Sequence, residues 1–378
     1  MLLPAQESAV FRGMFPALDE YLVLNAAGLS PIPVSCRDAM IRMVNGFADH
    51  VYMKQDEGEK NIAEARKTAA QMVGCSPEEI AFVKNTSHGL SLVASGLRLA
   101  PGDEVVINDI EFPSNVYPWL NLQRKGVAVR TAKSVNGRVP VDAIAAQINP
   151  KTRVLAISTV QYSTGYRVDL AALGQLARDR GLYFVVDAIQ SLGVIPMDVK
   201  KYGIHFLSSG GFKWLCGPVG SGIFYCDREK LNDLDITLAG WNTVANPLKY
   251  EVIDFTPKNN AQRFEEASGN YIGICGLGES MRLLSRTGIG RIEAHVLALN
   301  DYLEGKLNSR GVEIISPRGE GEKSGIFIFK PPKGEAPEAI WKRLEDRKIL
   351  AAPRGGGLRV SPHFFNTTGD MDRLLESL

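Results

Sequence analysis

Long apolar runs and an excess of charge of one sign are missing from this 378-residue sequence. No apolar stretch approaches the roughly 18 residues that a helix needs to cross a bilayer, so we expect no membrane span. Residues 1–7 do not join a basic region to a long apolar one, which argues against a secretory signal. The formal net charge is +1 and no basic run is present, so neither an acidic partner nor a nucleic acid is expected.

The cysteines are few and scattered. Five are present, an odd number, and no two of them form a C-x-x-C pair. This pattern favours free thiols in a reducing compartment over a disulfide framework or a zinc site. We therefore expect a cytoplasmic protein without a bound metal. The five are Cys36, Cys75, Cys216, Cys226 and Cys275.

The length and the composition indicate a globular protein of two unequal domains. The chain is 45% hydrophobic and 22% charged, and its 378 residues exceed what one ordinary core holds. From about residue 80 to residue 225, short apolar runs alternate with helical patterns, which predicts a mostly parallel sheet with helices on both faces. The expected strands are 80–83, 104–107, 128–130, 153–157, 183–186 and 222–225, and the expected helices include 115–124, 141–148 and 170–180.

The character of the sequence changes after about residue 255, where we expect a compact α+β unit. Its strands are predicted at 324–329 and 358–361, with a helix at 337–348 between them. A closing helix follows, and Thr367 and Asp370 resemble a capping box at its start. The predicted domains are a large one over residues 16–255 and a smaller one that combines residues 1–15 with residues 256–378.

Two residues of opposite charge lie in apolar or aromatic contexts, where a charged side chain without a function is unusual. Asp187 ends the apolar pattern 183–186, and Lys213 lies between Phe212 and Trp214 directly after a glycine pair. Taken singly, Asp187 could cap a helix, and Lys213 could lay its stem on the aromatic rings. Together they favour a buried lysine whose lowered pKa supplies a free amine near neutrality. An aldehyde cofactor with a pyridine ring needs such an amine to condense with the aldehyde, and a carboxylate to keep the ring nitrogen protonated.

Further candidates lie where such a sheet binds ligands, beyond the carboxyl ends of its strands. The turn 85–89 follows a strand and opens a helix, so its N–H groups suit a phosphate, although an ordinary N-cap gives the same pattern. Gln190 is close enough to Asp187 to donate to a phenolate oxygen, unless it is a solvated helix residue. Arg359 lies between apolar neighbours and suits either a substrate carboxylate or a surface ion pair. The small-residue turn 25–28 lets the backbone approach a ligand closely.

Five motifs follow one another along the chain in a recognisable order. They are Asn85-Thr86-Ser87-His88-Gly89, Val186-Asp187-Ala188-Ile189-Gln190, Gly210-Gly211-Phe212-Lys213-Trp214-Leu215 with Gly217-Pro218, Arg263-Phe264-Glu265 with Ala267-Ser268, and Leu358-Arg359-Val360-Ser361-Pro362-His363. In this order they resemble the class V aminotransferase family, which includes cysteine desulfurases, selenocysteine lyases and isopenicillin-N-epimerase-like proteins. The resemblance covers about residues 20–378.

The resemblance implies a pyridoxal 5′-phosphate enzyme of fold type I, whose large domain has a mostly parallel, seven-stranded sheet. Lys213 would condense with the cofactor aldehyde, Asp187 would hold the pyridine nitrogen, and Gln190 would lie near the phenolic oxygen. Ser268 would reach the phosphate across a subunit interface, which implies a homodimer with shared active sites. Phe112 would stack on the pyridine ring, Thr86, Ser87 and the backbone at His88 would take the phosphate, and Arg359, with Asn25 and Ala27, would bind the amino-acid substrate.

The sequence departs from the family pattern at three places. Desulfurases place a nucleophilic cysteine on a loop shortly before the carboxylate-binding arginine, and the corresponding stretch 349–357 contains none. Phe212 stands where desulfurases usually have histidine. Gly210 stands in the place of a common phosphate-binding serine, so either Ser208 or Ser209 substitutes for it or fewer hydroxyls hold the phosphate.

Three functions remain open on this basis. Analogy with relatives that act on sulfur amino acids favours a cysteine desulfurase-like C–S lyase that lacks the nucleophilic loop cysteine. An aminotransferase or an amino-acid epimerase of the same family is the alternative. A cofactor-free scaffold protein is disfavoured, because a scaffold needs none of Asp187, Gln190 and Lys213.

Overall fold

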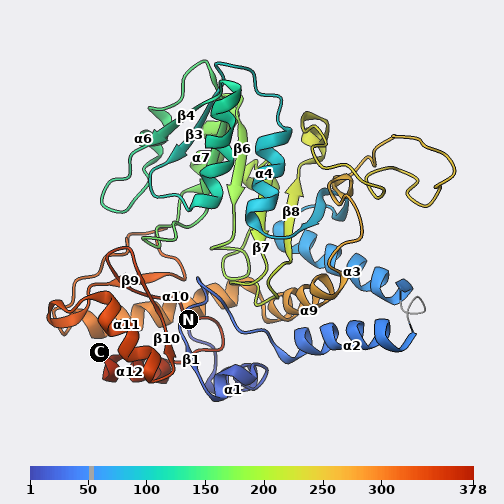
Figure 1. Ribbon diagram of the computed structural model, residues 1–378. Coiled ribbons are helices and arrows are strands. Elements are labelled where there is room, and N and C mark those ends of the chain that lie inside the picture. Colours follow the sequence, from blue (N-terminus) through green and yellow to red (C-terminus); the bar gives the residue numbers. More distant parts are fainter. Residues whose placement is uncertain (51–54) are drawn as a thin grey trace.

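The centre of the protein is a seven-stranded sheet, shown in the computed structural model, which describes residues 1–50 and 55–378 (Figure 1). Its strands are β2 (Ile80–Val83), β3 (Glu104–Asn108), β4 (Ala128–Ala132), β5 (Thr152–Ser158), β6 (Tyr183–Asp187), β7 (Phe206–Gly210) and β8 (Gly222–Cys226). The strand order is β2-β8-β7-β6-β5-β3-β4, and only the two pairs that involve β8 are antiparallel. The predicted α/β class with a mostly parallel sheet is confirmed.

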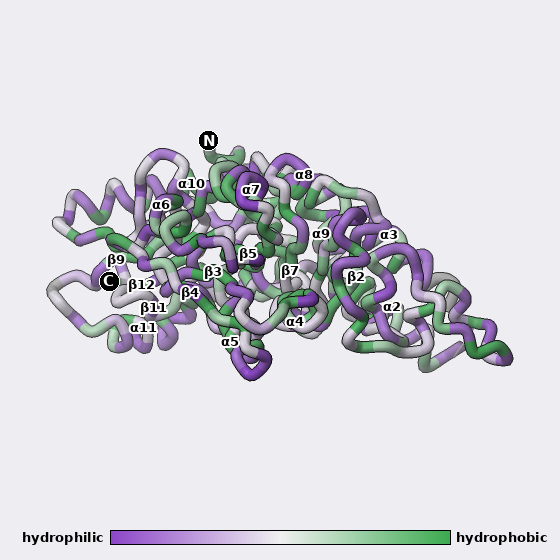
Figure 2. The backbone as a smooth tube through the Cα atoms, turned by 90° about the horizontal axis from the view of Figure 1, so that it is seen from above, coloured by the Kyte–Doolittle hydropathy of each residue, from purple (hydrophilic) through white to green (hydrophobic). Residues whose placement is uncertain are grey.

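The two faces of this sheet carry separate apolar cores, because successive strand residues point to opposite faces. On one face, Ile157 and Val186 belong to a core that includes α7 (Leu170–Asp179). On the other face, Val185 belongs to a core that includes α4 (Thr86–Gly96). In Figure 2, hydrophobic segments gather around β3, β5 and β7, and hydrophilic segments lie toward the periphery. A sheet that is buried on both faces leaves only its edges and strand ends for a ligand.

Three helices pack together beside the sheet: α2 (Val34–His50), α3 (Gln55–Val73) and α9 (Tyr271–Thr287). Small residues let them approach closely, because a Cβ added at Gly278 would lie 2.7 Å from the Cβ of Ala65. The next helix, α10 (Ile289–Asn308), begins directly after Gly288, whose φ of +90° ends α9.

The C-terminal unit contains a three-stranded antiparallel sheet of β9 (Phe327–Phe329), β11 (Ala352–Arg354) and β12 (Gly357–Val360), in the order β11-β12-β9. Two helices accompany it, α11 (Pro337–Asp346) and α12 (Thr368–Ser377), and the predicted capping box at the start of α12 is confirmed. The short strand β1 (Leu22–Val23) pairs with β10 (Ile349–Leu350), so the N-terminal part of the chain contacts this unit. The division at residues 15 and 255 stays our proposal.

Two expectations for the large sheet need correction. The helix expected at 115–124 is a series of short turns, because Pro113 and Pro118 each occupy the first turn of a new helical segment. β7 was not predicted at all, although it lies between β6 and β8.

The remaining elements are α1 (Ala5–Gly13), α5 (Tyr117–Leu120), α6 (Val141–Ala145), α8 (Val199–Tyr202), η1 (Pro16–Asp19), η3 (Pro77–Glu79), η4 (Pro113–Asn115), η5 (Asn121–Lys125), η6 (Arg228–Asp233), η7 (Ala261–Phe264) and η8 (Pro332–Gly334).

Among the described residues, no helix is long and apolar enough to span a bilayer. Within the same ranges, no group of three or more His, Cys, Asp or Glu side chains is placed to hold a metal ion. All five cysteines are free thiols.

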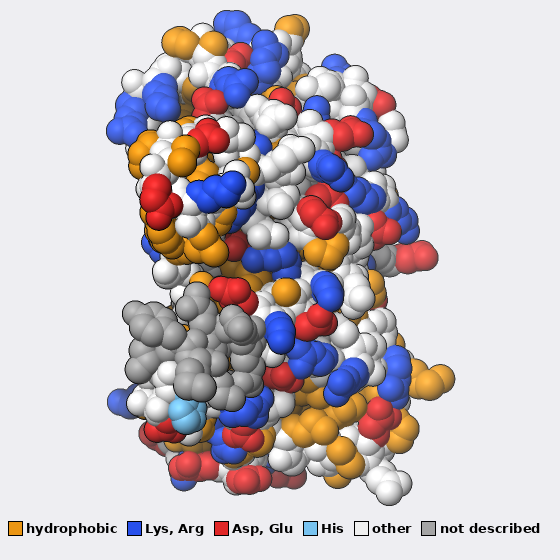
Figure 3. All heavy atoms as spheres, turned by 90° about the vertical axis from the view of Figure 1, so that its right-hand side faces the viewer, with side chains coloured by type: hydrophobic (Ala, Val, Ile, Leu, Met, Phe, Trp, Pro, Cys, Tyr) orange, Lys and Arg blue, Asp and Glu red, His pale blue; other side chains and the backbone are white. Residues whose placement is uncertain are grey.

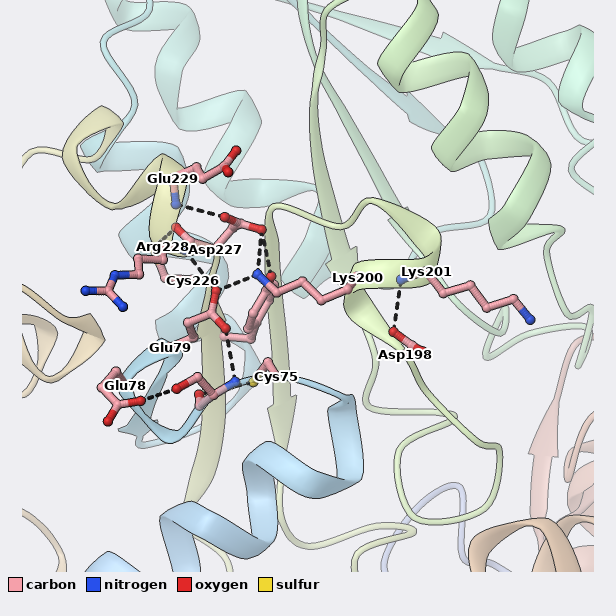
Figure 4. Close-up of polar contacts among 12 residues, drawn as sticks. Cys75, Glu78, Glu79, Asp198, Lys200, Lys201, Cys226, Asp227, Arg228 and Glu229 are labelled. Atoms are coloured by element: carbon pink, nitrogen blue, oxygen red, sulfur yellow. Dashed lines mark hydrogen bonds and ion pairs between the residues drawn. The ribbon is translucent and has the colours of Figure 1, made fainter.

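A buried carboxylate fixes the edge of the sheet at β2 (Figure 4). Glu79 Oε1 accepts hydrogen bonds from Lys200 Nζ at 2.6 Å and from the Arg228 N–H at 3.0 Å. Glu79 Oε2 accepts from the Ser76 N–H at 3.1 Å, and Lys200 also reaches Asp227 Oδ2 at 2.9 Å. The network joins η3, which precedes β2, to α8 and to the turn after β8.

We predict that Glu79→Ala destabilises the protein by about 2 kcal/mol, because it removes a buried carboxylate that accepts hydrogen bonds from two partly buried backbone N–H groups and from Lys200. The adjacent Glu78 is exposed, so Glu78→Ala is the matched control and should cost less than about 0.5 kcal/mol. Urea unfolding at one protein concentration measures both free energies. Equal losses for the two variants would show that the network does not hold this edge.

Candidate active site

A cavity of about 300 Å³ lies at the carboxyl edge of the large sheet, where the sequence predicted a ligand site. We call it the lysine cavity, after Lys213. Residues from the large sheet, from the N-terminal turn 25–28 and from the C-terminal strands β11 and β12 line it together. The lining residues are Ala27, Gly28, Asn85, Thr86, Ser87, Phe112, Ser114, Tyr162, Asp187, Ile189, Gln190, Phe212, Lys213, Arg354 and Arg359.

Asp187 is the last residue of β6, and its side chain is 1% exposed. Its Oδ1 accepts a hydrogen bond from the Ile189 N–H at 2.9 Å, whereas its Oδ2 has no partner among the described residues. The pKa of Asp187 is raised to about 7, chiefly by burial and to a smaller extent by the charge of Glu111, while the hydrogen bond from Ile189 and the charge of Lys213 oppose the shift. A buried oxygen without a donor is costly, so this position fits a ligand that presents a positively charged N–H group.

Lys213 follows the glycine pair after β7 and is also buried. It makes no hydrogen bond or ion pair within the described ranges, and its Nζ lies 5.5 Å from the ring centroid of Phe112 and 5.8 Å from that of Phe212. Burial lowers its pKa to about 8, an effect that Asp187 opposes and Arg359 reinforces. A larger share of this amine than of an exposed lysine is therefore unprotonated near neutral pH, as the sequence predicted.

Gln190 is held in place by its own amide. Its Oε1 accepts from the indole Nε1 of Trp214 at 2.9 Å, and its Nε2 donates to the Ala27 carbonyl at 3.1 Å. These bonds fix the amide orientation and use one of the two Nε2 hydrogens, which leaves the other for a ligand. They also link the turn 25–28 to the segment after β6.

Phe112 presents its ring to the lysine cavity and is 40% exposed. Its position is fixed by an edge-to-face contact with Tyr162, with the ring centroids 5.1 Å apart. A half-exposed aromatic ring beside Lys213 suits stacking against a planar group.

The N-terminus of α4 opens onto the same cavity. Asn85 caps the helix, and the N–H groups of the first turn have no intrahelical acceptor. The Thr86 hydroxyl accepts from the Gly210 N–H at 2.8 Å and keeps its own proton to donate. Ser87, which the sequence predicted to take the phosphate, is joined through its hydroxyl to that of Ser114 at 2.7 Å, and both line the cavity. The sequence did not single out Ser114. With Thr86, three hydroxyl-bearing side chains and a helix N-terminus fit an anion such as phosphate.

Four residues that were expected to contact the phosphate do not line the lysine cavity of their own chain. The His88 N–H donates to Asn85 Oδ1 at 2.9 Å and is therefore used by the cap. The Ser208 hydroxyl donates to the Thr86 carbonyl, and the Ser209 hydroxyl to the Gly210 carbonyl. Ser268 is exposed and lines a second cavity of about 600 Å³, together with the His88 side chain.

Arg359 is a buried cation without an acidic partner in the described part of the chain. It lies in β12, is 4% exposed, and donates to the Tyr162 carbonyl at 3.3 Å and to Asn25 Oδ1 at 3.2 Å. Its Nε has no acceptor. Its pKa is lowered to about 10, chiefly by burial and to a smaller extent by the charge of the neighbouring Arg354. Asn25 therefore orients the guanidinium, which fits a substrate carboxylate better than a surface ion pair.

Glu111 is a buried residue that the sequence did not single out. Its carboxylate accepts from the Ser158 N–H at 2.7 Å, from Asn108 Nδ2 at 2.5 Å and from Asn115 Nδ2 at 3.2 Å. It thereby ties the segment that carries Phe112 to the end of β5, the strand beside Asp187. The only sequence signal was a carboxylate placed between two asparagines just after a strand.

The residues present fit pyridoxal phosphate at three points. An unpaired carboxylate oxygen suits its pyridinium nitrogen, an amine without an acceptor suits its aldehyde, and the start of α4 suits its phosphate. The hydroxyls of Ser208 and Ser209 are engaged elsewhere, which leaves the alternative in which fewer hydroxyls hold the phosphate.

Known proteins resemble the chain over almost its whole length. The family described as Aminotransferase class-V matches residues 24–374. A probable cysteine desulfurase of Methanothermobacter thermautotrophicus is 30% identical over 393 residues, covering 97% of this chain and 96% of that protein. An isopenicillin N epimerase of Streptomyces clavuligerus is 27% identical, covering 94% of this chain and 93% of that protein. A solved cysteine desulfurase structure from Thermococcus onnurineus has a TM-score of 0.88 at 26% identity, covering 100% of this chain and 98% of that one.

These similarities confirm the fold type, the enzyme class and the cofactor that the sequence motifs implied: the protein is a pyridoxal-phosphate-dependent enzyme. From residue 24 to residue 374, the chain belongs to the class V aminotransferase family.

Proposed function

We propose that the protein is a C–S lyase related to cysteine desulfurases that works without a nucleophilic loop cysteine. The observation that carries this proposal is the lining of the lysine cavity, which includes Lys213, Asp187 and Arg359 but no cysteine. The stretch that follows β10 is a tight hairpin of β11 and β12, closed by Gly355 and Gly356 alone. The relative named a probable cysteine desulfurase supports a sulfur amino acid as substrate.

Each charged residue has one role in this proposal. Bound pyridoxal phosphate supplies an aldehyde for the substrate amine and a protonated ring that accepts the electrons of a bond broken at the substrate Cα. Asp187 Oδ2 accepts the hydrogen bond of the ring N–H and keeps that proton in place. Lys213 Nζ, once its amine is free, takes the proton from the substrate Cα, which suits a pKa near 8.

Arg359 binds the substrate carboxylate and so fixes which substituent of Cα points toward Lys213. With the cofactor bound, the remaining Nε2 hydrogen of Gln190 would be available to its phenolic oxygen, and the ring of Phe112 would be available to stack on the pyridine. Breaking a carbon–sulfur bond then requires only that the sulfur group leaves, with no thiol to receive it.

Transamination and epimerisation use the same residues and differ only in where the proton returns. The relative named an isopenicillin N epimerase supports epimerisation as the alternative. For the location we propose the cytoplasm, because all five cysteines are free thiols. Cell fractionation that finds the protein elsewhere would contradict this location.

The reaction is tested by offering the purified enzyme a panel of amino acids and following pyruvate, sulfide, keto acids and optical rotation. We predict sulfur release with formation of pyruvate from a cysteine-type substrate. Lys213→Ala is the control and should abolish turnover together with the visible absorbance of the lysine-bound cofactor. If a keto acid forms only when a second keto acid is supplied as amino acceptor, the enzyme is an aminotransferase. If optical rotation is lost without formation of pyruvate, it is an epimerase. Either result would contradict the lyase.

The lowered pKa of Lys213 gives a pH prediction for cofactor binding. Only the unprotonated amine attacks an aldehyde, so capture by the cofactor-free protein should accelerate from about pH 7 to about pH 9. Asp187 raises the pKa of Lys213 by its charge, so Asp187→Asn should move the midpoint to lower pH. Stopped-flow measurement of the visible band gives both midpoints. If the midpoint of the unmodified protein lies near the pKa of an exposed lysine, burial does not lower the pKa of Lys213.

We also propose a homodimer in which Ser268 reaches the phosphate of the partner's site. Ser268 does not line the lysine cavity of its own chain. The segment of residues 238–255 projects from the molecule in Figure 1, and Figure 3 shows hydrophobic side chains gathered on that side. Such an apolar surface is typical of an interface. The exposed apolar residues of this segment are Leu238, Trp241, Leu248, Tyr250, Val252, Ile253 and Phe255.

Mixed dimers test this arrangement. Lys213→Ala and Ser268→Asp should each be inactive alone, the second because a carboxylate repels the phosphate. After mixing and exchange of subunits, a shared site predicts that roughly a quarter of all sites regain both native residues, because half of the dimers are hybrids. No recovery in verified hybrid dimers would place Ser268 outside the partner's site.

A further inference from the structure

A second arginine lines the lysine cavity beside Arg359. Arg354 is exposed, and its only hydrogen bond within the described part of the chain is from its Nη1 to the carbonyl of the adjacent Pro353, at 3.0 Å. It makes no ion pair there. The only acidic side chain that lines this cavity is Asp187, which is buried and serves the cofactor ring in the proposed function. Arg354 is thus a cation at the cavity without an anion.

The strand register brings the two arginines to the same face. In the antiparallel pair β11–β12, Arg359 lies opposite Ala352, and Arg354 lies opposite Gly357. Side chains of opposed residues, and of residues two apart on one strand, share a face of the sheet. Arg354 and Arg359 therefore point to the same side. Their proximity agrees with the repulsion by which Arg354 lowers the pKa of Arg359.

The hairpin that carries Arg354 is held firmly against the cavity wall. Gly355 and Gly356 have φ values of +62° and +76°, as a two-residue hairpin turn with two left-handed residues requires. A Cβ at Gly355 would lie 1.9 Å from the Ser163 carbonyl oxygen, so only glycine permits this approach. Ser163 follows Tyr162, whose carbonyl receives Arg359. The turn thus fixes Arg354 at a constant place relative to Arg359.

We propose that the substrate is an α-amino acid with a second anionic group on its side chain, such as a carboxylate. Arg359 binds the α-carboxylate and Arg354 binds the distal anion. This inference rests on the proposed function, because it presumes that an amino acid enters the lysine cavity. The two guanidinium groups differ in burial, so Arg359 makes the contact common to all amino acids and the more exposed Arg354 selects among them.

Matched acid and amide probes test the proposal. S-carboxymethylcysteine is compared with S-carbamoylmethylcysteine, and glutamate with glutamine, by titrating the holoenzyme and recording the substrate-dependent change in cofactor absorbance. We expect each acid to bind roughly tenfold more tightly than its amide. In Arg354→Gln this ratio should fall to about one, while the affinity for the amides stays unchanged. The exposed Arg124, which does not line the cavity, provides the control Arg124→Gln, which should keep the preference.

Arg359→Gln separates the two roles, because it should weaken the binding of acids and amides equally. The ratio of their affinities should therefore stay the same. The proposal is overturned if the amides bind the unmodified enzyme as tightly as the acids, or if Arg354→Gln keeps the preference. If none of the four probes and no other amino acid changes the absorbance of the holoenzyme, the proposed function itself fails and this inference falls with it. Binding without an acid preference contradicts only the role of Arg354.

Discussion

The site depends on a carboxylate and an amine that are both buried and do not satisfy each other. Within residues 1–50 and 55–378, Asp187 keeps one oxygen without a donor, and Lys213 makes no hydrogen bond or ion pair through its amine. Burial shifts both pKa values toward neutrality, so neither charge is fixed strongly at physiological pH. Such an arrangement is unfavourable for stability alone and is explained by a ligand that completes it. The parallel strands make it possible, because their carboxyl ends bring residues distant in sequence to one edge.

Much of the fold could be predicted because its strands are short, apolar and buried on both faces. β7 escaped prediction since its second half, Ser208-Ser209-Gly210, is small and polar. Its hydroxyls are satisfied by neighbouring carbonyls, which no periodicity in the sequence reveals. The helix expected at 115–124 was wrong for a local reason, because Pro113 just before this range and Pro118 within it each begin a new short helical segment. The capping box of α12 was predictable because it depends on only two side chains, Thr367 and Asp370, which are three positions apart.

The site divides in the same way. Asp187 and Lys213 could be recognised because each interrupts an apolar context. Gln190 was found by its spacing from Asp187, and Arg359 by its apolar neighbours. The family motifs then implied a role for each of them. Glu111 and Ser114 could not, because their importance arises from contacts with strands that are remote in sequence. The roles expected of Ser208 and Ser209 rested on position alone, and position does not say where a hydroxyl points. The comparisons settle the family, whereas the reaction depends on proton transfers that relatives of one family perform differently.

The two-glycine turn between β11 and β12 has a consequence for what happens to the product. A chain segment with no slack cannot swing out of the cavity, so nothing tethered to it could carry an atom from the substrate to another macromolecule. In the reaction that we propose, the sulfur fragment would therefore diffuse away as a free small molecule. A relay to an acceptor protein would need a longer and more mobile connection at this place than Gly355 and Gly356 provide.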